Sequence, residues 1–88
     1  MNRIMIIGSP GSGKSTLAKI LSKKLNISLI HLDKLFWTEN WKSISNDEFD
    51  KKLSDAMKNK RWIIDGNYSR TFNLRAAQAD TIILLNYS

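Results

Sequence analysis

The segment Gly8–Thr16 constrains the fold more than any other stretch of the chain. It has the form G-x-x-x-x-G-K-[S/T] and it carries informative flanks. Residues 4–7 before it are apolar and mostly β-branched, which predicts a buried strand. After it, apolar residues recur at helical spacing over Lys14–Leu25, which predicts an amphipathic helix. A strand, a glycine-rich loop and a helix in this order predict a phosphate-binding loop rather than an ordinary strand-to-helix turn.

The residue types in this loop suit the binding of a nucleotide such as ATP. Glycines let backbone N–H groups approach an anion closely, and these donors add to the positive end of the helix dipole. We expect Lys14 to contact the β- and γ-phosphates, Ser15 to bind Mg²⁺ through its hydroxyl, and Thr16 to contact the α-phosphate. The predicted nucleotide-binding residues are Gly8, Pro10, Gly11, Ser12, Gly13, Lys14, Ser15 and Thr16.

The composition excludes several other classes of protein. The chain has 88 residues, of which 42% are hydrophobic and 25% charged, and this suits one small globular domain. It has no cysteine, so disulfides and thiolate metal sites are excluded. No apolar run approaches the roughly 18 residues that span a bilayer. The first strand follows the initial methionine too closely for a signal peptide, so we expect a cytoplasmic protein.

The net charge of +6 comes from 14 Lys and Arg residues against 8 Asp and Glu residues. Part of this excess has a structural explanation, because Lys51 and Lys52 follow Asp47 and Glu48 at the spacing of helix-surface ion pairs. Nucleic-acid-binding chains carry a basic stripe interleaved with aromatic residues. The sequence has no such stripe, so DNA is retained only as an alternative partner.

The rest of the chain alternates strand-like and helix-like segments, which predicts an α/β fold with a parallel sheet. Strands are expected over residues 28–32, 62–65 and 81–85, and helices over residues 46–59 and within 69–79. Ser45 and Glu48 form a capping box before the first of these helices. Between residues 34 and 45 the pattern is irregular. Trp37 and Trp41 in that region either pack in the interior or line an acceptor pocket.

Two aspartates follow predicted strands at the edge of the sheet where the phosphate loop lies. Ligands of open α/β sheets bind at the carboxyl ends of the strands. Asp65 is predicted to hold Mg²⁺ through a bound water, and the alternative is a simple turn with Gly66. Asp33 is predicted to accept the proton of an acceptor hydroxyl or to bind a metal-bound water, and the alternative is a helix N-cap. His31 has no identifiable partner and is given a structural role.

Three segments carry a resemblance to a known group of proteins. They are Ile6–Thr16, His31–Trp37 and Trp62–Tyr68. In them the chain resembles the adenylate-kinase-related P-loop proteins named for DNA topology modulation, over essentially its whole length. The resemblance implies a fold of nucleoside-monophosphate-kinase type with strand order 2-3-1-4. It also implies phosphoryl transfer from ATP, with Mg²⁺, to a small acceptor. A nucleotide-dependent regulator or DNA-associated protein without turnover is the alternative.

Arg70 and Arg75 are the further candidates for substrate binding. They follow the third predicted strand, where a guanidinium can clamp phosphate oxygens, and the alternative is that they are surface charges. Asp65, Gly66 and Arg70 are similar to the Asp-Gly-x-Pro-Arg segment of adenylate kinases, whose arginine binds the acceptor phosphate. Here the proline is missing and Arg70 is displaced by one residue. Asp33 lies where shikimate-type kinases carry an acceptor-binding aspartate, and this implies a hydroxyl acceptor.

The resemblance also implies that residues 1–88 are the N-terminal portion of a single kinase-like domain. Proteins of the resembled group continue with an arginine-bearing lid helix, a fifth strand and an adenine-binding loop. Without these parts we expect little or no turnover. We also expect self-association through the apolar strand 81–85, because a strand edge without its neighbour recruits another chain.

Overall fold

The computed structural model describes residues 1–9, 12–36 and 44–85. Pro10 and Gly11 of the phosphate loop and the tryptophans Trp37 and Trp41 therefore lie outside the described residues, and so do the predictions made for them.

A four-stranded parallel sheet forms the centre of the structure, as the sequence predicts. Its spatial order is β2-β3-β1-β4, which confirms the order 2-3-1-4. The strands are β1 (Arg3–Gly8), β2 (Leu29–His31), β3 (Trp62–Asp65) and β4 (Thr81–Leu85). Ile6 lies level with Asp65, and Asp65 lies level with His31. This register places the carboxyl ends of β1, β2 and β3 together at one edge of the sheet.

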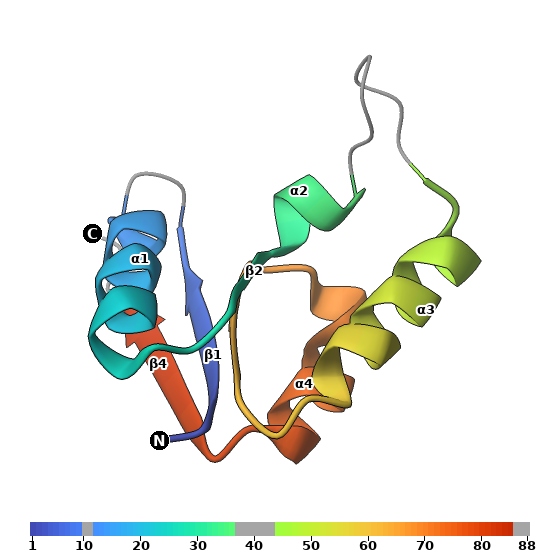
Figure 1. Ribbon diagram of the computed structural model, residues 1–88. Helices are drawn as coiled ribbons and strands as arrows, with labels where there is room; N and C mark the ends of the chain where they lie inside the picture. Colours follow the sequence, from blue (N-terminus) through green and yellow to red (C-terminus); the bar gives the residue numbers. More distant parts are fainter. Residues whose placement is uncertain (10–11, 37–43, 86–88) are drawn as a thin grey trace.

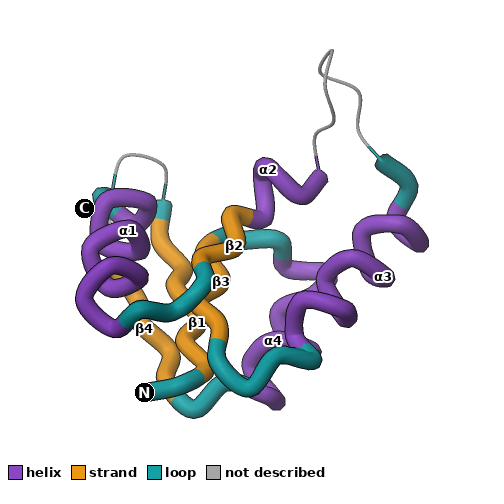
Figure 2. Tube along the Cα trace, viewed as in Figure 1, coloured by secondary structure: helices purple, strands orange, loops and turns teal. Residues whose placement is uncertain are grey.

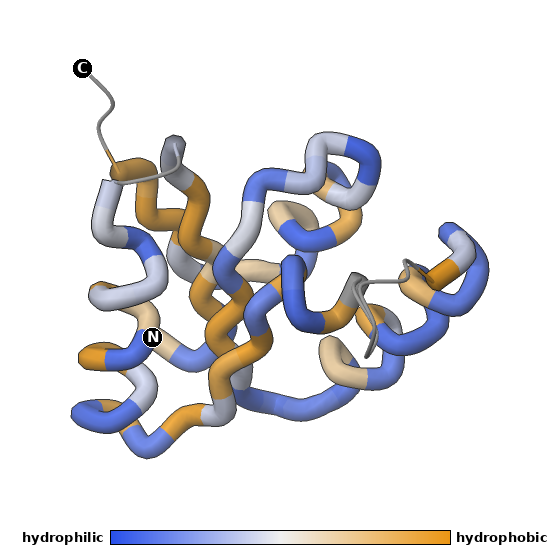
Figure 3. The backbone as a smooth tube through the Cα atoms, turned by 90° about the horizontal axis from the view of Figure 1, so that it is seen from above, coloured by the Kyte–Doolittle hydropathy of each residue, from blue (hydrophilic) through white to orange (hydrophobic). Residues whose placement is uncertain are grey.

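Helices cover both faces of the sheet (Figures 1 and 2). On one face lies α1 (Lys14–Leu25), with the bounds that the sequence predicts. On the other side are α2 (Leu32–Phe36), α3 (Asn46–Met57) and α4 (Phe72–Gln78), the last preceded by a 3-10 turn over Ser69–Thr71. The backbone coloured by hydropathy shows the most apolar segments along the central strands (Figure 3).

Two buried clusters correspond to the two faces. Beneath α1 the core consists of Ile4, Ile6, Ala18, Ile27 and Ile63. Beneath α2 and α3 it consists of Leu32, Ile44, Phe49, Leu53, Met57, Trp62 and Ile64. Consecutive residues of β3 thus belong to different clusters, because successive side chains of a strand point to opposite faces. Apolar residues on both faces explain why the strands are nearly continuous hydrophobic runs.

Local signals set the ends of the two long helices. Asn26 ends α1 in the left-handed conformation, with φ 54° and ψ 51°, as its side chain permits. Ser45 caps α3 by accepting a hydrogen bond from the Glu48 N–H at 3.2 Å, which confirms this part of the capping box. The predicted end of α3 at residue 59 is wrong by two residues, because the chain turns at Lys58 and Asn59 after the last apolar residue, Met57.

The strand β4 lies at an edge of the sheet and exposes apolar side chains on one face. Ile82 is 45% exposed and Leu84 68% exposed, whereas Ile83 and Leu85 pack against the cluster beneath α1. An exposed apolar strand at a sheet edge combines unpaired backbone groups with uncovered apolar surface.

We therefore expect the chain to self-associate through β4, as the sequence analysis predicts. Leu84→Lys should shift the light-scattering mass towards the monomer across a concentration series, because it places a charge on the exposed strand. Ile20→Lys is the matched control, since Ile20 is 46% exposed but belongs to α1 rather than to the sheet. A wild-type chain that stays monomeric at all concentrations contradicts the expectation.

Candidate functional site

The carboxyl edge of the sheet holds a cavity of about 170 Å³. Its lining comes from α1, β2, α2 and β3, and consists of Ser15, Lys19, His31, Asp33, Lys34 and Asp65. Three of the predicted site residues, Ser15, Asp33 and Asp65, are thus brought together from parts of the chain that are far apart in sequence. The two lysines were not predicted as site residues. Lys19 had a signal in the sequence, because it follows Ser15 by one helical turn.

The start of α1 leaves backbone donors available beside this cavity. Gly13 precedes the helix with φ 86°, a conformation that favours glycine, and among the described residues no side-chain hydrogen bond caps the helix start. The first turn also contains no acidic residue. Lys14 is half-buried at the first helical position, and Ser15 and Thr16 are exposed. Uncapped N–H groups at the positive end of a twelve-residue helix make a suitable site for a phosphate.

His31 contacts Asp65, so it has a partner that the sequence did not reveal. Its Nδ1 lies 2.6 Å from the Asp65 Oδ2. The two side chains are 16% and 7% exposed, so the contact is largely shielded from water. The level register of β2 and β3 produces this contact. This contact could not be predicted from the sequence, because the pairing of two strands 34 residues apart is not visible in a local pattern.

Asp33 lies in the first turn of α2 rather than directly after a strand. The predicted strand 28–32 is wrong at both ends, since β2 covers only Leu29–His31 and α2 begins at Leu32. The alternative in which Asp33 is the N-cap is also inaccurate, because Asp33 is the second residue of the helix. Its carboxylate nevertheless lines the cavity with Asp65. The Tyr68 hydroxyl donates a 2.9 Å hydrogen bond to the Asp33 Oδ1.

Tyr68 is held as a neutral hydrogen-bond donor. Burial raises the pKa of its phenol to about 12, and the hydrogen bond to the Asp33 carboxylate and the charge of Asp33 act in the same direction. Its ring lies 5.4 Å from the Phe49 ring, centroid to centroid, with the planes tilted by 57°. Tyr68 therefore connects α3 with the carboxylate at the cavity. No local pattern in the sequence predicts this role of Tyr68, which ends the segment Trp62–Tyr68.

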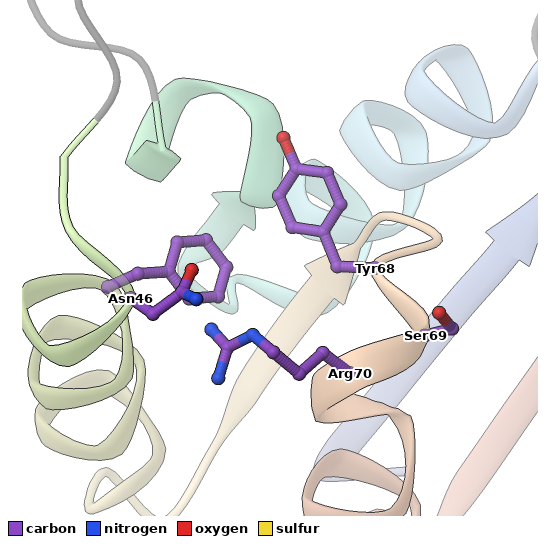
Figure 4. A pocket seen from close by; sticks show the side chains of 5 residues that line it. Asn46, Tyr68, Ser69 and Arg70 are labelled. Atoms are coloured by element: carbon purple, nitrogen blue, oxygen red, sulfur yellow. The ribbon is translucent and has the colours of Figure 1, made fainter.

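A second pocket of about 250 Å³ lies beside Tyr68 (Figure 4). It is lined by Asn46, Phe49, Tyr68, Ser69 and Arg70, and the close-up shows the Tyr68 ring and the Arg70 guanidinium around it. This lining combines two aromatic rings, one cation and small polar groups. It is suited to a small molecule with an apolar part and a polar or anionic group.

Arg70 is held at this pocket by an ion pair with α3. Its guanidinium donates two hydrogen bonds to the Asp50 carboxylate, at 3.0 and 2.8 Å, and lies 5.8 Å from the centre of the Phe49 ring. The hydrogen bond from Arg70 lowers the pKa of Asp50. Both side chains are more than 40% exposed, so water screens the pair and its contribution to stability is small. Arg70 is therefore held only weakly at the surface beside this pocket.

Arg75 has a different role from the predicted phosphate contact. It is fully buried, and its guanidinium donates to the Thr71 Oγ1 at 3.2 Å, the Gly66 carbonyl at 2.9 Å and the Tyr68 carbonyl at 2.6 Å. Burial lowers its pKa. Hydrogen bonds of a buried cation to these acceptors hold the segment 66–71 in place. This occupation of the guanidinium corrects the prediction that Arg75 clamps a substrate.

The donor set of the smaller cavity fits a Mg²⁺ ion held mainly by a bound nucleotide. Mg²⁺ prefers oxygen ligands and keeps several waters, with one or two carboxylates in addition to phosphates. The Ser15 hydroxyl and the Asp65 carboxylate supply such oxygens at one cavity. Within the described ranges no group of three or more His, Asp or Glu side chains could hold a metal without the phosphates.

The Tyr68 pKa generates a testable dependence of stability on pH. An unfolded tyrosine has a pKa of about 10. Because the folded value is higher, the stabilising contribution is fully present below about pH 10 and is lost as the pH rises towards 12. The wild type should have a higher unfolding free energy than Tyr68→Phe below about pH 10. After a discount for solvent screening, this difference should fall by about 1 kcal/mol over the window. Urea denaturation of both proteins measures it, and a constant difference contradicts the assignment.

The described part of the chain contains no helix long and apolar enough to cross a membrane.

Comparison with known proteins places the chain among kinase relatives. A shikimate kinase of Sulfurihydrogenibium sp. (strain YO3AOP1) is 42% identical over 59% of this chain and 31% of its own length. An adenylate kinase of Wigglesworthia glossinidia brevipalpis is 53% identical over 43% of this chain and 18% of its own length. A shikimate kinase of Dehalococcoides mccartyi is 33% identical over 94% of this chain and 55% of its own length. The chain spans less than two thirds of each of these curated relatives.

A family model gives broader coverage than these relatives. The AAA_18 model, described as an AAA domain, matches residues 4–87 and therefore includes the phosphate loop and all four strands. The narrower resemblance to the DNA topology modulation group stays a prediction. The chain belongs to the AAA_18 family of AAA domains and is a P-loop protein related to kinases.

Proposed function

We propose that this chain carries the phosphate-binding and acceptor-activating part of an ATP-dependent phosphotransferase that acts on a hydroxyl of a small molecule. The observation that supports this most strongly is the cavity that Ser15, Asp33 and Asp65 share beside the start of α1. A phosphate-binding helix end, a hydroxyl and two carboxylates are the groups that phosphoryl transfer requires. The relatives named as shikimate and adenylate kinases are consistent with this class of reaction.

Each residue has a separate role in the proposed reaction. Lys14 and the backbone N–H groups at the start of α1 bind the phosphates of the nucleotide. Ser15 and Asp65 hold Mg²⁺, which neutralises charge on the phosphates when it is bound. His31 fixes one oxygen of Asp65. The acceptor oxygen forms a bond to the γ-phosphorus as the bond to the ADP oxygen breaks, and Asp33 takes the proton of the acceptor hydroxyl.

The larger pocket is the proposed binding site of the acceptor. It adjoins Asp33 through Tyr68, which lines this pocket and donates to Asp33. Asp33 accepts that bond on Oδ1, so Oδ2 can face the acceptor hydroxyl. Arg70 is proposed to bind an anionic or polar group of the acceptor by exchanging its bond to Asp50. This retains Arg70, but not Arg75, as a substrate residue.

Nucleotide binding is tested with Lys14→Ala. Loss of a charge-assisted contact should weaken binding of Mg–ATP by ~1.5–3 kcal/mol, or roughly 10- to 150-fold in Kd. Isothermal titration calorimetry on the 88-residue chain measures the change. Lys24→Ala is the matched control, since Lys24 is an exposed lysine in the last turn of the same helix. Equal affinities of the wild type and Lys14→Ala would exclude a phosphate contact by Lys14.

Acceptor activation is tested with Asp33→Asn in the full-length protein. The amide keeps an oxygen that accepts from Tyr68 but cannot take a proton, so transfer should fall by ~10²–10⁴-fold while Mg–ATP affinity stays unchanged. Phosphate transfer from labelled ATP to a panel of small hydroxyl compounds provides the rate. Asp55→Asn, which removes an exposed carboxylate of α3, is the control. Salt-dependent DNA binding without any transfer by the wild type would favour the DNA-associated alternative instead.

A further inference from the structure

The phosphate loop begins where β1 loses its neighbouring strand. Pairing of β1 with β3 runs from Arg3 with Trp62 to Ile6 with Asp65. The last backbone bond along this edge is donated by the Gly66 N–H to the Ile6 carbonyl, at 3.1 Å. Beyond it β3 has ended, although β1 continues to Gly8. The peptide groups of Gly8 therefore need another partner on this side, because an unpaired backbone group in a shielded position is costly.

The side chain of Asn67 supplies this partner. The Gly8 N–H donates to the Asn67 Oδ1 at 2.9 Å, and the Asn67 Nδ2 donates to the Gly8 carbonyl. A primary amide has a donor and an acceptor side by side, as a backbone residue of a strand does. The two hydrogen bonds thus extend the backbone pairing on this side of β1 from Ile6 to Gly8. Neither the motif analysis nor the strand pattern predicted this contact.

Gly8 is fixed on its remaining sides by close packing. A Cβ atom at this position would lie 2.7 Å from the Ser12 Oγ and 2.9 Å from the Leu85 Cβ. Gly8 also lies level with Leu85 of β4. Gly8, the first residue of the phosphate loop, is therefore enclosed by Ser12, β4 and the Asn67 amide. The Asn67 amide forms hydrogen bonds with both the N–H and the carbonyl of Gly8.

Asn67 itself is held by a segment that also shapes the acceptor side. Its neighbours Gly66 and Tyr68 both accept hydrogen bonds on their carbonyls from the buried Arg75. The Tyr68 hydroxyl, one residue further, donates to Asp33. The segment that anchors the phosphate loop is thus the same segment that orients the proposed acceptor base.

From this geometry we propose that Asn67 is a positioning residue of the phosphate site. Its amide clamps Gly8 and so fixes the start of the phosphate loop relative to the segment 66–70. The clamp is a property of the free chain, whereas its effect on nucleotide affinity rests on the proposed function. A backbone fixed before the ligand arrives costs less to order on binding, so loss of the clamp lowers affinity.

The test compares Asn67→Ala with the wild type by two measurements on the 88-residue chain. Amide hydrogen exchange followed by NMR reports whether the Gly8 N–H is protected. Calorimetry with Mg–ADP reports the affinity of the phosphate loop. Asn59→Ala is the matched control, because the Asn59 Nδ2 also donates to a backbone carbonyl, that of Ala56 at 3.0 Å, but at the far end of α3. Protection of the Ile4 and Ile6 amides of β1 shows that the variants are folded.

In Asn67→Ala we expect Gly8 to lose protection by roughly tenfold or more while Ile4 and Ile6 keep theirs. The Kd for Mg–ADP should rise about three- to tenfold, the range of one or two net hydrogen bonds. Asn59→Ala should change neither quantity. Unchanged protection of Gly8, or lost protection with unchanged affinity, overturns the inference. A wild type that binds no Mg–ADP contradicts the proposed function and the effect on affinity, whereas the exchange of Gly8 still decides whether the clamp exists.

Discussion

The parallel pairing of β1 with β3 is the contact on which the rest of the site depends. It joins the strand before the phosphate loop to the strand that carries Asp65, with Ile6 and Asp65 level. Pairing of β3 with β2 then brings His31 beside the same carboxylate. Apolar side chains on both faces of these strands, buried beneath α1 and α3, fix the register. A shift by one residue would turn Asp65 away from the cavity and into the core.

The polar groups at the sheet edge support one another. Ser15, Asp33 and Asp65 line the cavity. His31, which also lines it, and Tyr68, from the neighbouring pocket, each hold one oxygen of a carboxylate. Such supporting hydrogen bonds restrict the orientations of the groups that contact a ligand, and a restricted site loses less entropy on binding. We therefore expect the supporting residues to affect function although they need not touch a substrate.

The sequence predicted the parts of this architecture that depend on local pattern. The phosphate loop, the helix Lys14–Leu25 and the four strands follow from glycine positions and hydrophobic periodicity, which act over a few residues. The contacts of His31 with Asp65 and of Asn67 with Gly8 depend on strand register and on the turn after β3, which no local pattern specifies. For the same reason Arg75 was assigned to a ligand. A charged residue is expected at the surface. The backbone carbonyls that allow Arg75 to be buried cannot be identified from the sequence.

We propose that the start of α1 and the ends of β2 and β3 form one metal–nucleotide site. The most direct test is paramagnetic relaxation by Mn²⁺ in place of Mg²⁺, measured by NMR on the chain with ADP. The account predicts that the resonances of Ser15, His31 and Asp65 broaden only when ADP and Mn²⁺ are both present. The resonances of Asp55 and Lys58, an exposed ion pair at the end of α3, should stay sharp. Broadening that spares Ser15 and Asp65, or that does not require ADP, would contradict it.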